Sequence, residues 1–308
     1  LKKKKTQDDL RLEFEATVLL MVGRVCRWRP RAPVRWSSLA DLGRVGFSLT
    51  GHNVIAALTA QIDSLMLGRW FGAGALGFYN RPAQLLALAN QHLCAPTTQV
   101  LLAALSRLAP SSPHFAQHTR ETANRLAYLT LPFAAVCMSL SDEIVRRILG
   151  AAWPQAAPLL RWLALHAAVS HLGATLYAVS VASGKTSRLA VMSGATLGTT
   201  LFGMWCGRGY GPEGVAAGVA LASLALFLPR VMWTIHGTSL RPRDFGAAFA
   251  GPILLAAAIA FGSLSGLGLT SHPSWMARLG LGLAGGALAG LAVFAASASV
   301  RHELGRQW

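Results

Sequence analysis

Acidic side chains are scarce in this sequence, and charged residues of any kind are few. The chain has 308 residues, of which 12 are Asp or Glu and 13% are charged, whereas soluble domains carry about 25% charged residues. Hydrophobic residues make up 53% of the chain, and they gather in runs long enough to cross a bilayer. This composition excludes an ordinary soluble domain and predicts a membrane protein with several spanning segments.

Residues with the spacing that enzymes and metal sites need are also missing. Four cysteines lie far apart in the sequence: Cys26, Cys94, Cys137 and Cys206. Their spacing predicts small packed side chains rather than disulfides or a metal site. No GxSxG sequence marks a hydrolase nucleophile, and the GKT at 184–186 lacks the earlier glycine of a phosphate-binding loop, since Val179 stands there. We expect no enzyme, no cofactor and no metal.

The formal charge of +16 raises the possibility of nucleic-acid binding, but its distribution argues otherwise. Most of the 28 Lys and Arg residues lie in short segments between apolar runs, as in the basic cytoplasmic loops of membrane proteins. Most also fall on the side that holds the N-terminal region, and Arg230 is counted there. We expect no nucleic-acid partner and place both termini in the cytoplasm.

The apolar runs predict an all-α fold, a polytopic bundle of about eight transmembrane helices. The expected spans are 43–67, 75–104, 119–141, 155–181, 187–207, 213–235, 246–267 and 274–299. Glycines at four-residue spacing, as in Gly194 with Gly198 and in Gly282 with Gly286 and Gly290, favour close helix packing within the chain.

The first of these helices is unusual because polar residues interrupt it. Asn53 falls near mid-membrane, where an amide joins helices or contacts a substrate. Asp63 falls near the far end, where it either pairs with Arg69 or Arg81 or acts as a coupling or gating carboxylate. A helix of this kind faces a cavity or a packed bundle, which favours a transporter over a simple anchor.

Four arginines at helix ends are candidates for contacting an anionic substrate: Arg69, Arg81, Arg125 and Arg161. Arginine binds phosphate oxygens in a bidentate manner and stays charged when partly buried. Each could instead extend its side chain to the membrane interface.

Residues 50–81 carry a set of motifs that together point to a family. These are Thr50-Gly51-x-Asn53, Asp63 followed by Gly68-Arg69 and Gly72, and Leu76-Gly77-x-Tyr79-x-Arg81. This stretch resembles the signature region of bacterial polysaccharide-repeat exporters, the lipid-linked oligosaccharide flippases of the multidrug/oligosaccharidyl-lipid/polysaccharide superfamily. The resemblance extends over about residues 35–235.

The resemblance implies two six-helix bundles that face each other, often with two extra C-terminal helices. On this basis residues 1–36 are expected to be a basic cytoplasmic segment or the remnant of a preceding helix. Residues 37–236 are expected to be the second bundle, and 237–308 two extra helices. The chain starts at Leu1, so we expect a truncated half that lacks its N-terminal bundle.

The family also implies the function. We expect translocation of undecaprenyl-pyrophosphate-linked oligosaccharide repeats across the bacterial inner membrane, for lipopolysaccharide, O-antigen or exopolysaccharide synthesis. Arg81, Arg161, Arg125 and Asn53 would bind the substrate, while Asp63 and Arg69 would serve coupling or gating. Half of a multidrug-type exporter and a membrane-embedded glycosyl or acyl transferase remain the alternatives.

Overall fold

The computed structural model describes residues 36–269 without a gap, together with Thr17, Met21 and a few single residues between 276 and 288. Over this range the chain is helical, with no strand in the part that is described. The elements are α2 (Trp36–Ala89), η1 (Asn90–Cys94), α3 (Ala95–Leu105), α4 (Pro113–Ser139), α5 (Ser141–Ile144), η2 (Val145–Leu149), α6 (Ala156–Ala182), α7 (Thr186–Gly207), η3 (Arg208–Tyr210), α8 (Gly211–Ile235) and α9 (Pro242–Leu269). Residues 1–44 and 45–308 form two separate units, and only the second is described further.

The expected helices agree with these elements to within a few residues, up to α9. Apart from the start of α2, at Trp36 rather than 43, the largest difference is the start of α4, which begins at Pro113 rather than 119. Ser112 explains it, because its side chain accepts a hydrogen bond from the backbone N–H of His114 and Pro113 occupies the first helical position. The expected segment 1–36 and the expected last helix, 274–299, lie outside the described residues apart from isolated positions.

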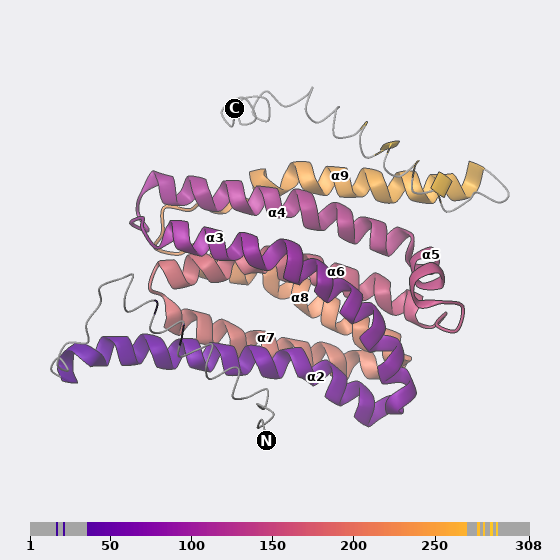
Figure 1. Ribbon diagram of the computed structural model, residues 1–308, viewed down its shortest axis with the longest axis horizontal. Coiled ribbons are helices and arrows are strands. Elements are labelled where there is room, and N and C mark those ends of the chain that lie inside the picture. The colour runs from indigo at the N-terminus through magenta and orange to yellow at the C-terminus, as the bar shows by residue number, and fades with distance from the viewer. Residues whose placement is uncertain are drawn as a thin grey trace, which may run out of the picture. The chain divides into compact units, whose positions relative to one another are not determined.

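A sharp bend at Gly72 divides α2 into two helices (Figure 1). Gly72 has φ of 81° and ψ of 179°, a conformation that a residue with a Cβ adopts only under strain. The first part of α2 and the part after the bend correspond to the first two expected helices. The second part continues through the π-helical turn η1 into α3. This turn precedes Pro96, which cannot make the regular hydrogen bond of an α-helix.

From α3 onward the helices run back and forth, each antiparallel to the next (Figure 1). Two segments are long and apolar enough to cross a membrane, Ala156–Ala182 and Thr186–Ile235. A third is added if Pro113–Ser139 and Ser141–Leu149, bent by 81° at their junction, count as one span. The exact number of eight spans is therefore not confirmed, since α2 is more polar and part of the chain lies outside the described range.

Helix α6 lies at the centre of this unit and packs against α3, α4 and α8. Its buried face is rich in small side chains, including Ala157, Ala164, Ala168 and Ala178. Small residues let neighbouring helices approach closely, which is how helices associate where lipid removes the hydrophobic driving force.

The closest helix crossing joins α7 to α8 through glycines. A Cβ on Gly203 would lie 2.3 Å from the Gly218 carbonyl oxygen, and a Cβ on Gly207 would lie 2.0 Å from that of Gly214. The expected packing glycines Gly194 and Gly198 face open space instead, so that prediction was wrong. The expected glycines on the last helix, 282–290, lie outside the described side chains.

Basic side chains hold the turns together where α6 and α8 end. Lys185 Nζ donates a hydrogen bond of 2.6 Å to the carbonyl oxygen of His236, and Arg188 donates one of 3.1 Å to the same atom. These cations satisfy a carbonyl left free at the end of α8. Burial and the nearby Arg188 charge lower the pKa of Lys185 from its ordinary value.

Candidate functional site

Asp63 lies where the two parts of α2 meet across the Gly72 bend. The Tyr79 hydroxyl donates a hydrogen bond of 2.8 Å to Asp63 Oδ2. Asp63 Oδ1 is buried and has no hydrogen-bond partner among the described residues. One residue further along on each side, the Ser64 hydroxyl donates to Asn80 Oδ1 at 3.1 Å. We call these four residues the α2 clasp, because they join the helices on either side of the bend.

The clasp changes the expected pairing of Asp63. Neither Arg69 nor Arg81 contacts the carboxylate, and both arginine side chains are exposed. The Arg81 guanidinium lies over the ring of Trp153 instead, 5.6 Å from its centroid. The predicted Asp63–Arg69–Arg81 cluster is therefore wrong in its contacts, although all three residues lie toward the same end of the unit.

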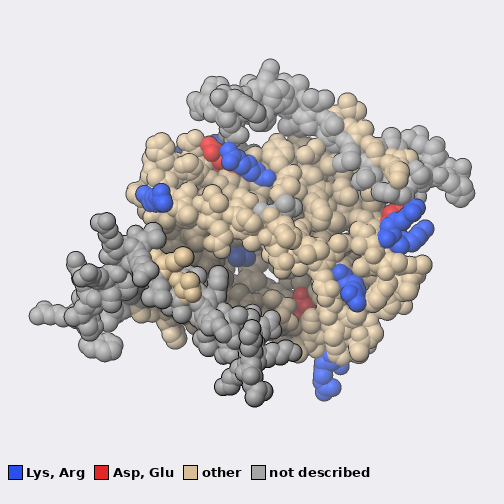
Figure 2. Space-filling model, in the orientation of Figure 1, with Lys and Arg blue, Asp and Glu red and all other residues tan. Residues whose placement is uncertain are grey.

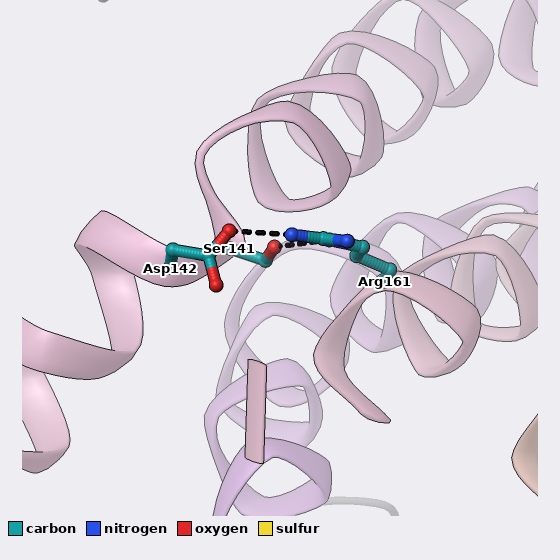
Figure 3. A network of polar contacts seen from close by, with 3 residues as sticks. All are labelled: Ser141, Asp142 and Arg161. Atoms are coloured by element: carbon teal, nitrogen blue, oxygen red, sulfur yellow. Dashed lines mark hydrogen bonds and ion pairs between the residues drawn. The ribbon is translucent and has the colours of Figure 1, made fainter. Parts of the chain in front are cut away.

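Arg161 has an acidic partner in the short helix α5 (Figure 3). Its Nε donates a hydrogen bond of 2.6 Å to Ser141 Oγ, and its Nη2 forms an ion pair with Asp142 Oδ2. These contacts tie the start of α6 to the bend between α4 and α5. Because Asp142 already neutralises this arginine, Arg161 is less available to a substrate phosphate than the sequence predicted.

We predict that Arg161→Gln lowers the free energy of unfolding only slightly. Both partners are about half exposed, at 48% for Arg161 and 53% for Asp142, so water screens the pair and its contribution stays below about 1 kcal/mol. Thermal unfolding of Arg161→Gln, Asp142→Asn and the double variant in detergent measures this. A loss from Arg161→Gln that is much larger, or that is unchanged by Asp142→Asn, would contradict the assignment.

The remaining predicted residues, Arg125 and Asn53, are exposed on α4 and α2. Neither makes a side-chain hydrogen bond or ion pair with another described residue. The structure therefore brings none of the six predicted site residues into contact with another, as far as the described chain shows. Nor do three His, Cys, Asp or Glu side chains gather at one place within the range searched for metal sites.

A groove of about 920 Å³ runs along α7 and α8. Apart from Thr199, Tyr210 and Glu213, its lining is apolar or glycine, and Trp162 closes one side. Cys206 also lines it and is exposed, in contrast to the buried position that the sequence predicted. Because no basic side chain lines this groove, it does not suit an anionic group.

Three polar residues and a glycine instead follow one face of α6: His166, Ser170, Tyr177 and, between them, Gly173. We call this the α6 polar face. Nδ1 of His166 lies 2.7 Å from Ser223 Oγ on α8, and Ser170 Oγ lies 3.4 Å from His166 Nε2. Polar groups inside an apolar helix face protein or water rather than lipid.

Helix α2 reaches the α6 polar face through His52. The ring of His52 stacks on Tyr177 with centroids 5.3 Å apart, and its Nδ1 lies 2.5 Å from Ser193 Oγ on α7. The Ser193 hydroxyl donates its proton to the Leu189 carbonyl, so Nδ1 of His52 is the donor in the contact with Ser193. Sequence analysis did not select His52, although it adjoins Asn53.

Arg230 on α8 completes this group, and the sequence analysis counted it as a loop residue. Its Nη1 lies 3.2 Å and its Cζ 3.5 Å from the place where a Cβ on Gly173 would be, so the guanidinium rests on the α6 polar face. It is close enough to His52 to act on that ring electrostatically. In the space-filling view, the surface is hollowed near the centre, and a basic side chain is visible at the bottom of the hollow (Figure 2).

Known proteins resemble this chain in sequence. Residues 11–158 match the family model described as polysaccharide biosynthesis protein. The teichuronic acid biosynthesis protein TuaB of Bacillus subtilis (strain 168) is 25% identical over 139 residues, which are 45% of this chain and 29% of TuaB. The lipopolysaccharide biosynthesis protein WzxC of Escherichia coli (strain K12) is 24% identical over 136 residues, 44% of this chain and 28% of WzxC.

A solved structure agrees with these matches. The lipid II flippase MurJ, in its inward closed conformation, superimposes with a TM-score of 0.62 at 13% identity, over 77% of this chain and 51% of MurJ. The chain is therefore similar to polysaccharide biosynthesis proteins in sequence and to the flippase MurJ in fold. As the sequence predicted, the described part of the chain is all-α and has a fold of the helical membrane type. Its matched part spans less than a third of TuaB and of WzxC and about half of MurJ.

Proposed function

We propose that this chain is a member of the polysaccharide flippase family and takes part in moving lipid-linked saccharide repeat units across the bacterial inner membrane, for synthesis of a surface polysaccharide. The observation that carries the proposal is the family match over residues 11–158, joined to a MurJ-like fold. TuaB and WzxC are named for the synthesis of two different saccharide polymers. Transport of this kind breaks no covalent bond, so we propose no enzymatic role, cofactor or metal.

We further propose how the described helices serve this transport. The carrier would be undecaprenyl pyrophosphate, and the termini would lie in the cytoplasm, as the excess of basic residues there favours. Residues 37–236 would then form one bundle that works against a second bundle. Asn53 and the exposed Arg81 and Arg125 would contact the substrate. Asp63 and Arg69, which both lie in the part of α2 before the Gly72 bend, would serve coupling or gating.

The α2 clasp supports the gating role of Asp63. A carboxyl group with one oxygen unpartnered inside a membrane protein is costly. A carboxyl group that is held without a full set of partners at the bend between two helices is typical of a group that changes partner between two states. The bend at Gly72 supplies the place where the two parts of α2 would change angle.

Translocation in vesicles tests the proposal. The full chain is reconstituted in liposomes that carry a fluorescent isoprenyl-diphosphate-linked saccharide in both leaflets, and dithionite is added outside. We expect the protected inner half of the signal to become accessible faster than in protein-free vesicles, whereas a fluorescent phosphatidylethanolamine stays protected. Equal rates for both lipids, or a rate equal to that of empty vesicles, would contradict transport by this chain.

A further inference from the structure

Arg230 is a described side chain that the proposed architecture does not yet use, and its direction is informative. Gly173, on which its guanidinium rests, lies about nine residues before α6 ends at Ala182. At 1.5 Å per residue the guanidinium is therefore about 13 Å inside that end of the helix, near the middle of a hydrocarbon core of about 30 Å. The side chain does not extend toward the nearer interface.

The packing of α6 against α8 fixes this direction. The His166–Ser223 contact and the Gly173–Arg230 contact lie seven residues apart on both helices, so α6 and α8 run parallel and in register. A side chain on a helix leans toward the N-terminus of that helix. For Arg230 the N-terminus of α8, at Gly211, lies toward the opposite membrane face, so the side chain leans inward.

Within the described range of the chain, no carboxylate pairs with the guanidinium. The structure shows no ion pair or hydrogen bond of Arg230 with any residue in its described part. The neighbouring groups are the His52 ring, Ser180 and Thr234, with Arg188 lining the same small pocket. A cation held in a membrane bundle among neutral and basic groups is costly unless an anion joins it.

We propose that Arg230, seated on Gly173 and close to His52, binds a phosphate group at mid-membrane depth. On the proposed function, this group belongs to the diphosphate that links lipid to saccharide. Arginine donates two parallel hydrogen bonds to phosphate oxygens, and Gly173 leaves the space in which the guanidinium lies flat against α6. The site lies inside the bundle, apart from the exposed Arg81 and Arg125, so it holds the anion during passage rather than at entry.

Ligand binding to the purified full chain in detergent tests this without requiring transport. The probes are farnesyl diphosphate, inorganic diphosphate and phosphatidylglycerol, followed by isothermal titration. We expect farnesyl diphosphate to bind, and Arg230→Gln to weaken it at least tenfold, because charge-assisted hydrogen bonds to phosphate are lost. Arg230→Lys should retain part of the affinity. Gly173→Ala should weaken binding by displacing the guanidinium.

Arg208→Gln is the matched control, because Arg208 is an exposed arginine at the opposite end of α8, over Trp205. We expect its affinity to stay within twofold of the unaltered chain. Tighter binding of inorganic diphosphate than of farnesyl diphosphate would assign the site to a free anion, and tighter binding of phosphatidylglycerol would assign it to a membrane lipid. Either result overturns the assignment to the translocated substrate.

The outcomes also separate this inference from the proposed function. If Arg230→Gln lowers the unfolding temperature but leaves diphosphate affinity unchanged, Arg230 is structural and the inference fails. If Arg230→Gln does not fold, loss of affinity in Gly173→Ala, measured on folded protein, supports the site, and unchanged affinity there overturns it. Failure of vesicle translocation with an Arg230-dependent diphosphate site intact would contradict the transport proposal alone.

Discussion

A chain with Gly207→Val is expected to unfold at least about 10 °C below the unaltered chain, because the crossing of α7 and α8 has no room for a side chain. A Cβ at this position would lie 2.0 Å from the Gly214 carbonyl oxygen and 2.5 Å from its carbon. Backbone atoms cannot rotate away as a side chain does, so the helices must separate. Thermal unfolding in detergent, followed by tryptophan fluorescence, measures the shift.

Gly198→Val provides the control on the same helix. A Cβ at Gly198 would meet nothing within 4 Å, so the added side chain should change the unfolding temperature by no more than a few degrees through helix propensity. The glycine crossing would be the wrong explanation if the two variants lost the same amount of stability.

The second large effect is expected at the α2 clasp. Tyr79→Phe removes the hydroxyl that donates to Asp63 Oδ2 and leaves the carboxyl group with neither oxygen hydrogen bonded, since Oδ1 is already without a partner among the described residues. An unsatisfied buried polar group costs about 2 kcal/mol, and more if it is charged. We expect a matching drop in the free energy of unfolding in denaturing detergent titrations.

A double-mutant cycle distinguishes the lost hydrogen bond from lost packing. Asp63→Leu replaces the carboxyl group with an apolar side chain of similar size, and removing both partners of a hydrogen bond is far less costly than removing one. The double variant Asp63→Leu/Tyr79→Phe should therefore be more stable than the sum of the two single losses predicts. Strict additivity would show that Tyr79 acts through its ring alone.

The partner of Asp63 illustrates how far the sequence leads at this site. The break between the expected spans 43–67 and 75–104 was predicted, and a hairpin about Gly72 places Asp63 opposite residues 79–81. Successive helical residues are 100° apart, so Tyr79 and Arg81 point in nearly opposite directions and only one can face Asp63. In the structure Tyr79 is buried, at 3% exposed, and faces Asp63, whereas Arg81 is exposed. Which of the two residues is buried depends on packing against distant helices, which the local sequence does not reveal.

A functional role of Arg230 could be predicted from the sequence, but its position could not. It lies inside the predicted span 213–235, and an ionisable residue within a membrane span is a functional candidate by that fact alone. Counting it with the basic loop residues concealed this signal, which was present in the sequence. Its seat on Gly173 was not predictable, because the register between α6 and α8 depends on contacts between helices that are distant in the chain.

The packing glycines were predicted by type but assigned to the wrong positions. Four-residue spacing says that two glycines share a helix face, but not which face meets a neighbour. The pairs Gly203/Gly207 and Gly214/Gly218 are placed symmetrically about the turn at Arg208–Tyr210. In an antiparallel hairpin such symmetry brings the two pairs opposite each other, and this was the signal that could have identified them.

The symmetric glycine pairs affect the order in which the helices assemble during synthesis. The α7–α8 crossing joins residues close in the chain, so it can form as soon as both helices have left the ribosome and entered the bilayer. The contact between α4 and α9, where Asn124 donates to the Ala248 carbonyl, must wait until all the helices between them are in place. We therefore expect the hairpin to enter the membrane as a preassembled pair, and α9 to dock last, onto helices that are already inserted.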